Sequence, residues 1–149
     1  MGRVPETTIL EFAEIDADKN LAEKMGILPG DRLFKLKRLR SADGTPMMVE
    51  QTFLPVRKFL ALKRNLLESM PLYNIIEQVY SEKIRFAEEE FYASVARPSD
   101  AHILDIAESA PVLDLERVTY NTSNEVIEYT LSVARADQFK YRVVHQRTP

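Results

Sequence analysis

The chain has 149 residues, 45% of them apolar and 29% charged, which fits one soluble domain with a hydrophobic core. Its net charge of −3 lacks the basic excess of a domain that binds nucleic-acid phosphates, and the absence of cysteine excludes disulfides, thiolate nucleophiles and cysteine-bound metals. No apolar run approaches the roughly 20 residues of a membrane-spanning helix and no signal peptide begins the chain, so we expect a cytoplasmic protein without a membrane partner.

The first elements are expected to be a strand and a short helix. β-Branched and aromatic residues predict a strand over residues 7–15. Asp16 is expected to cap a helix that Gly26 ends in a left-handed conformation, and the apolar side of this helix would consist of Leu21, Ala22 and Met25.

Residues 33–40 and 47–54 predict a hairpin, because Asp43-Gly44 between two apolar runs is typical of a tight turn. Pro55 closes the second strand, and a short helical segment is expected over residues 56–62.

A longer helix is expected from Pro71, because proline suits the first helical position and apolar residues follow at helical spacing: Leu72, Ile75, Ile76, Val79 and Tyr80. Residues 83–96 predict a strand, and Pro98 opens another helix whose apolar side would consist of Ile103, Leu104 and Ala107. A second hairpin is expected from residues 111–120 and 126–135, and a last strand over residues 139–144.

This order of hairpins and intervening helices predicts one α+β domain over residues 1–149, an antiparallel sheet with helices packed on it. A faint internal repeat aligns residues 33–38 with 112–117, and a glutamate follows each arginine eleven or twelve residues later: Glu50 after Arg38, and Glu128 after Arg117. We interpret the repeat as two helix–hairpin units related by a pseudo-twofold, with chance similarity between two hairpins as the alternative.

Arg38 and Arg40 share a strand face with Phe34 and Leu36, because side chains alternate along a strand. The face passes from apolar side chains to two guanidinium groups, which offer paired donors to phosphate or carboxylate. Two interpretations remain open: a strand whose end emerges into solvent, or a sheet face that leads from the core into an anion pocket.

The position of Glu50 depends on the length of the hairpin turn. A two-residue turn places Glu50 opposite Lys37 on the other face, whereas a three-residue turn pairs it with Arg38 on the arginine face. In the second arrangement, the carboxylate either accepts hydrogen bonds from a ligand or forms an ordinary cross-strand ion pair.

Further polar residues are candidates for a binding site. Tyr73, in the first turn of its helix, either points its hydroxyl at a ligand or packs in the core. Glu128 shares a strand face with Thr130 and Ser132, which indicates either a wet cavity or an exposed sheet face.

Nothing in the sequence indicates catalysis, a cofactor or a metal. His102 and His145 lie far apart and are interpreted as structural, and the acidic run at residues 88–90 as a solvated strand edge. No nucleophile elbow, phosphate-binding loop or dinucleotide-binding glycine motif occurs among the four glycines.

Several blocks, spread over residues 7–144, match one known pattern: LKRLR at 36–40 with ADGTP at 42–46, Glu50 with TFLP at 52–55, PLY at 71–73, and EYT at 128–130 with RAD at 135–137. Residues 90–96 fit a strand of the form glutamate-aliphatic-x-Ala-x-x-Ala, with Phe91 at the aliphatic position. In order and spacing these blocks resemble the UTRA domain, the UbiC transcription regulator-associated domain of GntR regulators of the HutC type.

The resemblance implies a chorismate-lyase-like fold, a homodimer and an effector pocket in each domain. It implies that an anionic metabolite such as a sugar phosphate is the effector and that the residues in contact with it are Arg38, Arg40, Glu50, Tyr73 and Glu128; we add Ser132, which shares the face of Glu128. It also implies that operator DNA is bound only by an N-terminal winged helix-turn-helix domain, which we expect to be absent from this chain.

Three departures from the family pattern alter the expected pocket. Pro71 stands where the family often has a phosphate-binding serine, Ala134 where sugar-phosphate sensors tend to have tyrosine, and residues 135–139 read RADQF where RGDRY is common. We therefore expect a roomier pocket with fewer donors at one end, and an anionic effector other than N-acetylglucosamine 6-phosphate.

The sequence thus predicts a non-enzymatic domain that binds an effector and forms a dimer in a bacterial transcription regulator. One alternative is an enzyme of the chorismate lyase type, which shares the expected fold. The other is a dimerisation module whose pocket has decayed and is blocked by side chains.

Overall fold

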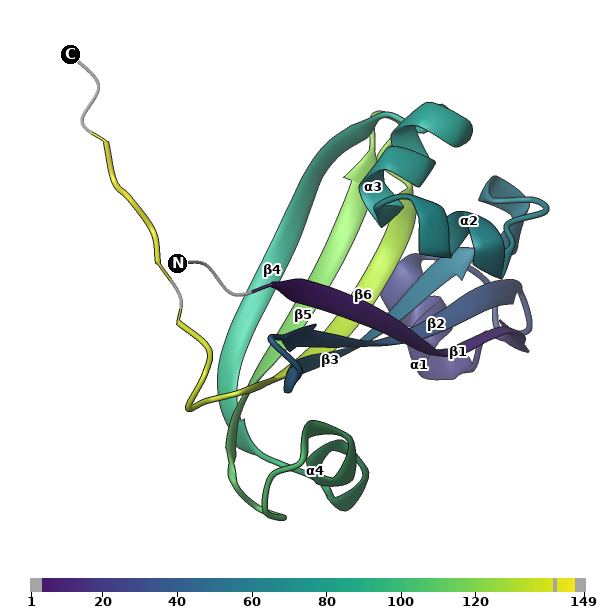
Figure 1. The fold of residues 1–149 in the computed structure, drawn as a ribbon. Helices are drawn as coiled ribbons and strands as arrows, with labels where there is room; N and C mark the ends of the chain where they lie inside the picture. Colours follow the sequence, from purple (N-terminus) through teal and green to yellow (C-terminus); the bar gives the residue numbers. More distant parts are fainter. Residues whose placement is uncertain (1–3, 141, 147–149) are drawn as a thin grey trace.

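Six strands form one antiparallel sheet in the order β1-β2-β3-β6-β5-β4, in a computed structural model that describes residues 4–140 and 142–146 (Figure 1). The strands are β1 (Pro5–Asp16), β2 (Arg32–Ala42), β3 (Thr45–Pro55), β4 (Ile84–Val95), β5 (Pro111–Asn121) and β6 (Val126–Arg135). The helices are α1 (Lys19–Met25), α2 (Arg64–Ser69), α3 (Leu72–Asn74) and α4 (Pro98–Leu104), with a 3-10 turn η1 (Val56–Lys58) and a π-helical turn η2 (Ile75–Val79). The α+β prediction is confirmed.

The sheet consists of two three-stranded meanders that meet along β3 and β6, and this strand order agrees with the predicted pseudo-twofold. Thr52 lies opposite Thr130 at the junction, and their hydroxyl oxygens are 2.9 Å apart. Glu50 and Glu128 each precede one of these threonines by two residues, so the two carboxylates lie symmetrically about the junction.

The repeat read from the sequence is displaced by two residues from the repeat in the sheet. Thr52 lies opposite Leu36 in β2, whereas its counterpart Thr130 lies opposite Arg117 in β5. The symmetry of the ladders therefore relates Arg117 to Leu36 rather than to Arg38. The two hairpins differ in turn length and in the position of their bulges, which explains the displacement.

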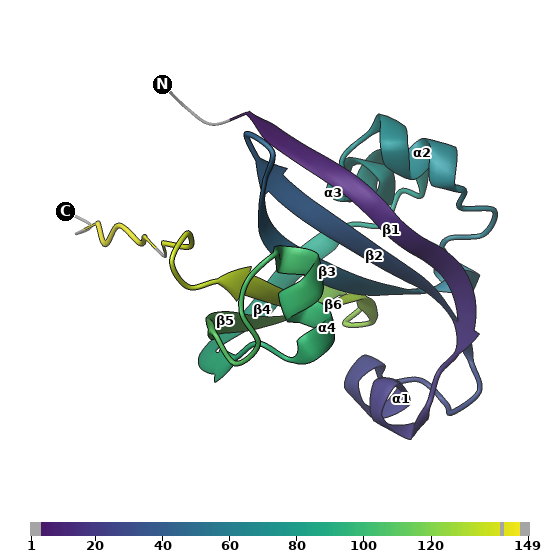
Figure 2. The ribbon, with the colours of Figure 1, turned by 60° about the horizontal axis from the view of Figure 1, so that its bottom comes forward.

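Helices cover the sheet unequally on its two faces (Figure 2). The face that carries Phe34, called here the pocket face, packs at one end against η1, α3 and η2 in a core that includes Leu54, Phe59, Ile75 and Ile76. The opposite face packs against α1 and α4, in two smaller clusters centred on Leu21, Ala22 and Met25 and on Ala101 and Val112. Part of the pocket face therefore remains open beside α3.

The cap of α1 lies two residues later than predicted. Asp18 is the N-cap and its Oδ1 accepts a hydrogen bond from the backbone N–H of Leu21 at 2.8 Å. Asp16 instead ends β1 and forms an ion pair with Arg32 at 2.9 Å, because β1 extends further than the β-branched run indicated. Gly26 ends the helix in the left-handed conformation, as predicted, with φ of 65°.

The segment between β3 and β4 differs from the prediction in two places. The helical segment expected over residues 56–62 is only the turn η1, and α2 was not predicted. The helix after Pro71 continues from α3 into the π-helical turn, in which the backbone N–H of Tyr80 donates to the Ile75 carbonyl at 3.1 Å. This wider turn carries Val79 off the apolar stripe, so Val79 is 47% exposed.

The strand expected over residues 139–144 is not formed by the described residues of that range; residue 141 lies outside them. After β6 the chain turns, and the backbone N–H of Phe139 donates to the carbonyl of Arg135 at 3.0 Å. Val143 and Val144 are 55% and 67% exposed. The sequence of this segment suits a strand, but the chain turns away from the sheet after β6. No described strand lies beside the segment to accept its backbone hydrogen bonds.

Candidate functional site

The β2–β3 hairpin places Glu50 directly opposite Arg38. Its turn has two residues, Asp43 and Gly44, both with positive φ, as a type I′ turn requires. A two-residue turn alone would bring Lys37 opposite Glu50, but a bulge at Met47 shifts the register by one residue. The two pairings predicted for Glu50 differed only in the length of the turn. The bulge, which neither prediction included, decides the pairing.

The arginine-bearing face of β2 leads from the core into an open pocket. Exposure along this face is 4% for Phe34, 0% for Leu36 and 7% for Arg38, whereas the Arg40 side chain is 48% exposed. The pocket has a volume of about 500 Å³ and lies between this end of the sheet and the segment from α2 to α3. We call it the arginine pocket, since it is lined by Arg38, Arg40 and Arg117 together with Pro71, Tyr73 and neighbouring residues. The decayed-pocket alternative requires side chains to block this pocket, and they leave it open.

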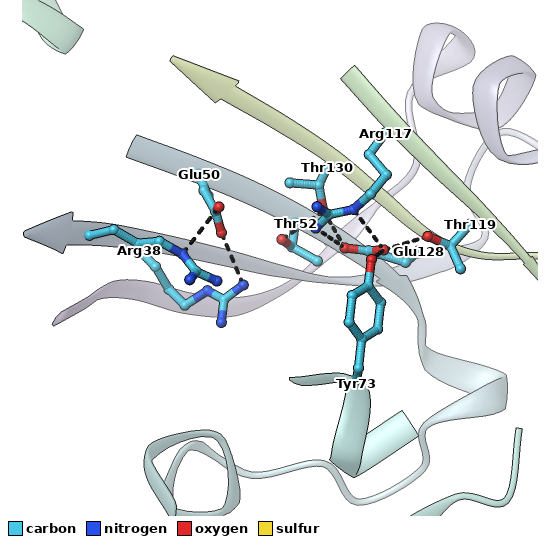
Figure 3. Close-up of polar contacts among 9 residues, drawn as sticks. Arg38, Glu50, Thr52, Tyr73, Arg117, Thr119, Glu128 and Thr130 are labelled. Carbon is cyan, nitrogen blue, oxygen red and sulfur yellow. Dashed lines mark hydrogen bonds and ion pairs between the residues drawn. The ribbon is translucent and has the colours of Figure 1, made fainter. Parts of the chain in front are cut away.

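Glu50 is shared by two arginines at the outer end of the pocket (Figure 3). Its Oε2 lies 3.2 Å from Nη2 of Arg38 and its Oε1 lies 3.1 Å from Nε of Arg40. The Nε of Arg38 is buried and has no hydrogen-bond partner. Burial lowers the pKa of Arg38, opposed by the charge of Glu50, so this guanidinium is short of compensating partners. Protein groups therefore compensate the charge and the donors of Arg38 only in part.

Glu128 lies beside the inner end of the pocket and accepts hydrogen bonds from five donor groups. Its Oε1 accepts from the hydroxyls of Thr119 at 2.6 Å and Tyr73 at 3.1 Å and from Nε of Arg117 at 3.3 Å. Its Oε2 accepts from Nη2 of Arg117 at 2.8 Å and from the hydroxyl of Thr130 at 2.7 Å. Burial alone would raise the pKa of Glu128, but these hydrogen bonds and the Arg117 charge outweigh it and lower the pKa. The carboxylate is ionised, fully buried and saturated with donors.

Arg117 lines the pocket although it was not predicted as a site residue from the sequence. It lies on β5 opposite Thr130, lines the pocket, and its guanidinium carbon lies 5.5 Å from the centre of the Tyr73 ring. Burial would lower the pKa of Arg117, but the two hydrogen bonds and the charge of Glu128 outweigh burial and raise it. The internal repeat, which aligned Arg117 with Arg38, was the sequence signal that could have identified it.

The six residues predicted for the site divide into two sets. Arg38, Arg40 and Tyr73 line the pocket. The other three, Glu50, Glu128 and Ser132, are buried in the sheet beside it, and Ser132 lies opposite Glu50 with 6% of its surface exposed. Pro71 lies at the pocket wall as the residue before α3, whereas Ala134 is fully buried in β6 and lines none of it.

Other hollows lack this concentration of buried charge. One of about 390 Å³ lies beside the end of α1, and one of about 330 Å³ is lined by apolar residues around Pro55 and Leu60 together with the charged residues Asp31, Arg32 and Arg57. Within residues 4–140 and 142–146, no group of three or more acidic or histidine side chains could hold a metal ion, and no helix is long and apolar enough to cross a membrane.

Comparison with known proteins gives consistent results. The family model of the UTRA domain matches residues 1–140. The chain is 30% identical over 140 residues to the HTH-type transcriptional repressor NagR of Bacillus subtilis, covering 94% of this chain and 57% of that protein. It is 29% identical over 139 residues to the mannosyl-D-glycerate transport/metabolism system repressor MngR of Escherichia coli, covering 93% and 58%. The chain thus spans little more than half the length of these relatives.

A solved structure has the same fold. The ligand-binding domain of a protein assigned to the GntR family of transcriptional regulators, from Bordetella bronchiseptica, superposes with a TM-score of 0.90 at 24% identity. The match covers 98% of this chain and 91% of that one, so almost every element of the fold is shared.

Proposed function

This chain belongs to the UTRA domain family, the effector-binding domains of GntR-type transcription regulators, and we propose that its arginine pocket binds a small anionic metabolite that controls the regulator. The observation that carries the proposal is the convergence of Arg38, Arg40 and Arg117 on one open pocket, where the buried guanidinium of Arg38 has only part of its charge and donors compensated. An anion in the pocket would compensate the charge of this buried guanidinium.

The names of the relatives support an anionic, carbohydrate-like effector. The Escherichia coli relative is named as repressor of a mannosyl-D-glycerate system, and glycerate carries a carboxylate. Both it and the Bacillus subtilis relative are named as repressors, so control of DNA binding is the role we propose for the whole protein. The arginines would fix the anionic group of the effector, and the inner part of the pocket near Tyr73 would receive its uncharged part.

Control of DNA binding requires that the effector distinguish two arrangements of the regulator. We propose that the chain acts as a homodimer in the cytoplasm and that effector binding changes the relative placement of two DNA-binding domains. Such a shift occurs only if the effector binds the two arrangements with different affinity. Sedimentation of the purified chain measures the dimer directly, and a monomer at all concentrations would contradict this part of the proposal.

The effector-binding proposal is tested by thermal unfolding of the chain with sugar phosphates, sugar acids and small carboxylates. A ligand at a hundred times its dissociation constant adds about 2.7 kcal/mol to the unfolding free energy. We expect one chemical class to raise the midpoint, and a double variant with Arg38→Gln and Arg40→Gln to lose that response while remaining folded.

The matched control is Arg57→Gln, which removes a side chain 65% exposed at the surface, outside the arginine pocket. This variant should respond as the parent chain does. A response that survives the double variant would show that the ligand binds elsewhere and would contradict the assignment of the pocket.

A further inference from the structure

The charges at the arginine pocket leave a single positive charge in excess. Three guanidinium groups, those of Arg38, Arg40 and Arg117, are opposed by the two carboxylates of Glu50 and Glu128. At the rim, Glu68 is already paired with Arg64 through an ion pair of 3.0 Å and adds no net charge. A ligand with one negative charge would therefore make the filled pocket neutral.

The excess charge belongs to the outer end of the pocket. At the inner end, Glu128 binds both Nε and Nη2 of Arg117, so these two residues form a neutral pair. At the outer end, a single carboxylate, that of Glu50, is divided between Arg38 and Arg40. The buried, unpartnered Nε of Arg38 lies at this end, and the Arg38 side chain is 91% buried.

Besides the guanidinium groups, the side-chain donors that line the pocket are the hydroxyls of Thr7, Ser69 and Tyr73, and the last two already donate within the protein. Pro71 has neither an N–H nor a hydroxyl to donate. The hydroxyl of Ser69 donates to the Leu66 carbonyl at 2.9 Å, and that of Tyr73 donates to Glu128. A phosphate dianion has three terminal oxygens and a carboxylate has two, so the same donors would leave more acceptor sites of a phosphate unsatisfied.

From these observations, and resting on the function proposed for the pocket, we infer that the effector is a monocarboxylate rather than a phosphate ester. Its carboxylate binds Arg38 and Arg40, and an uncharged oxygen of the same molecule accepts a hydrogen bond from Arg117. A doubly charged phosphate would leave an uncompensated negative charge in a half-buried site beside Glu50, which is unfavourable. Glu128 then acts as a positioning residue, which holds Arg117 and Tyr73 and does not touch the effector.

The test uses two methyl-bearing probes, acetate and methyl phosphate, at constant ionic strength. The arginine Nε–H signals of the 15N-labelled chain are followed by NMR, with that of Arg38 as the reporter. At pH 7.5 acetate should bind at least about fivefold more tightly than methyl phosphate. Phosphate monoesters change from dianion to monoanion at about pH 6, so methyl phosphate should bind on the order of tenfold more tightly at pH 5.5 than at pH 7.5, while acetate changes little.

The variants separate this inference from the proposed function. Arg40→Gln should weaken the binding of both probes, measured by the Arg38 signal. Arg57→Gln should leave the binding of both probes unchanged. If methyl phosphate at pH 7.5 binds at Arg38 as tightly as acetate or more tightly, the carboxylate inference is overturned and the anion pocket stands. If neither probe shifts the Arg38 signal at roughly 100 mM, which corresponds to binding weaker than about −1.4 kcal/mol, the anion pocket itself is overturned.

Discussion

Arg38 of β2 and Glu50 of β3 lie directly opposite each other, with Nη2 and Oε2 3.2 Å apart, because the single bulged residue Met47 offsets the two-residue turn of their hairpin. Without the bulge, every side chain of β3 would face the other side of the sheet relative to β2. One irregular residue therefore brings a carboxylate beside two arginines and determines the charge of the pocket.

Replacing this carboxylate should have opposite effects on stability and on anion binding. Glu50→Gln removes a charge that compensates the buried Arg38, so the unfolding free energy should fall by about 1–3 kcal/mol. The pocket gains one positive charge, so acetate and methyl phosphate should both bind more tightly, and methyl phosphate should gain more. Urea denaturation and the NMR titration measure the two effects. A loss of anion affinity in the folded variant would show that Glu50 contributes directly to binding.

Two of the residues that donate to Glu128, Arg117 and Tyr73, should contribute unequally to stability. Arg117→Gln leaves a fully buried carboxylate without its ion-pair partner and should lower the unfolding free energy by about 3–5 kcal/mol. Tyr73→Phe removes one of five donors and should lower it by only about 1 kcal/mol. Denaturant unfolding of both variants checks the order. Equal losses would mean that the Arg117 ion pair contributes no more than the single hydrogen bond from the Tyr73 hydroxyl.

Glu128 should make the stability of the domain depend on pH. Its pKa in the folded chain lies below the ordinary 4.5, so its ionised form stabilises the fold. This stabilisation is complete above about pH 4.5 and is lost as pH falls through the lower folded pKa. The difference in unfolding free energy between the parent chain and Glu128→Gln should therefore be constant near neutrality and shrink in acid.

Denaturation of both chains from pH 7 to pH 3 measures this difference. Subtraction removes the contributions of Glu125 and Asp137, whose pKa values are also lowered by basic neighbours. A difference that grows as the solution becomes more acidic would contradict the assigned direction of the pKa shift.

The cap of α1 provides a matched pair of aspartates. Asp18→Ala removes the acceptor for the Leu21 N–H and should lower the unfolding free energy by about 1 kcal/mol, with a range of about 0.5–2. Asp16→Ala removes an exposed ion pair with Arg32, which should change it by less than about 1 kcal/mol. Thermal unfolding distinguishes them, and the reverse order would mean that Asp16 contributes more to the fold than the cap.

Local patterns in the sequence determined most of the elements and the position of the two arginines at the outer end of the site. The alternation of Phe34, Leu36, Arg38 and Arg40 along one strand was sufficient to place two arginines at the end of a buried face, because strand geometry fixes which side chains share a face. The two hairpins followed from turn residues and apolar runs in the same way. These features depend on neighbours close in the chain, and such neighbours are visible in the sequence.

The inner half of the site was decided only by the tertiary structure. Tyr73 of α3 meets Arg117 and Glu128 of the β5–β6 hairpin from a separate part of the chain, and Thr52 meets Thr130 only because β3 and β6 pair at the junction of the two meanders. The Met47 bulge, the π-helical turn before Tyr80 and the turn after Arg135 likewise changed registers that periodicity alone would have kept. A shift of one residue is nearly invisible in composition and pattern, yet in a sheet it moves every following side chain to the other face, so packing between distant segments decides which register is stable.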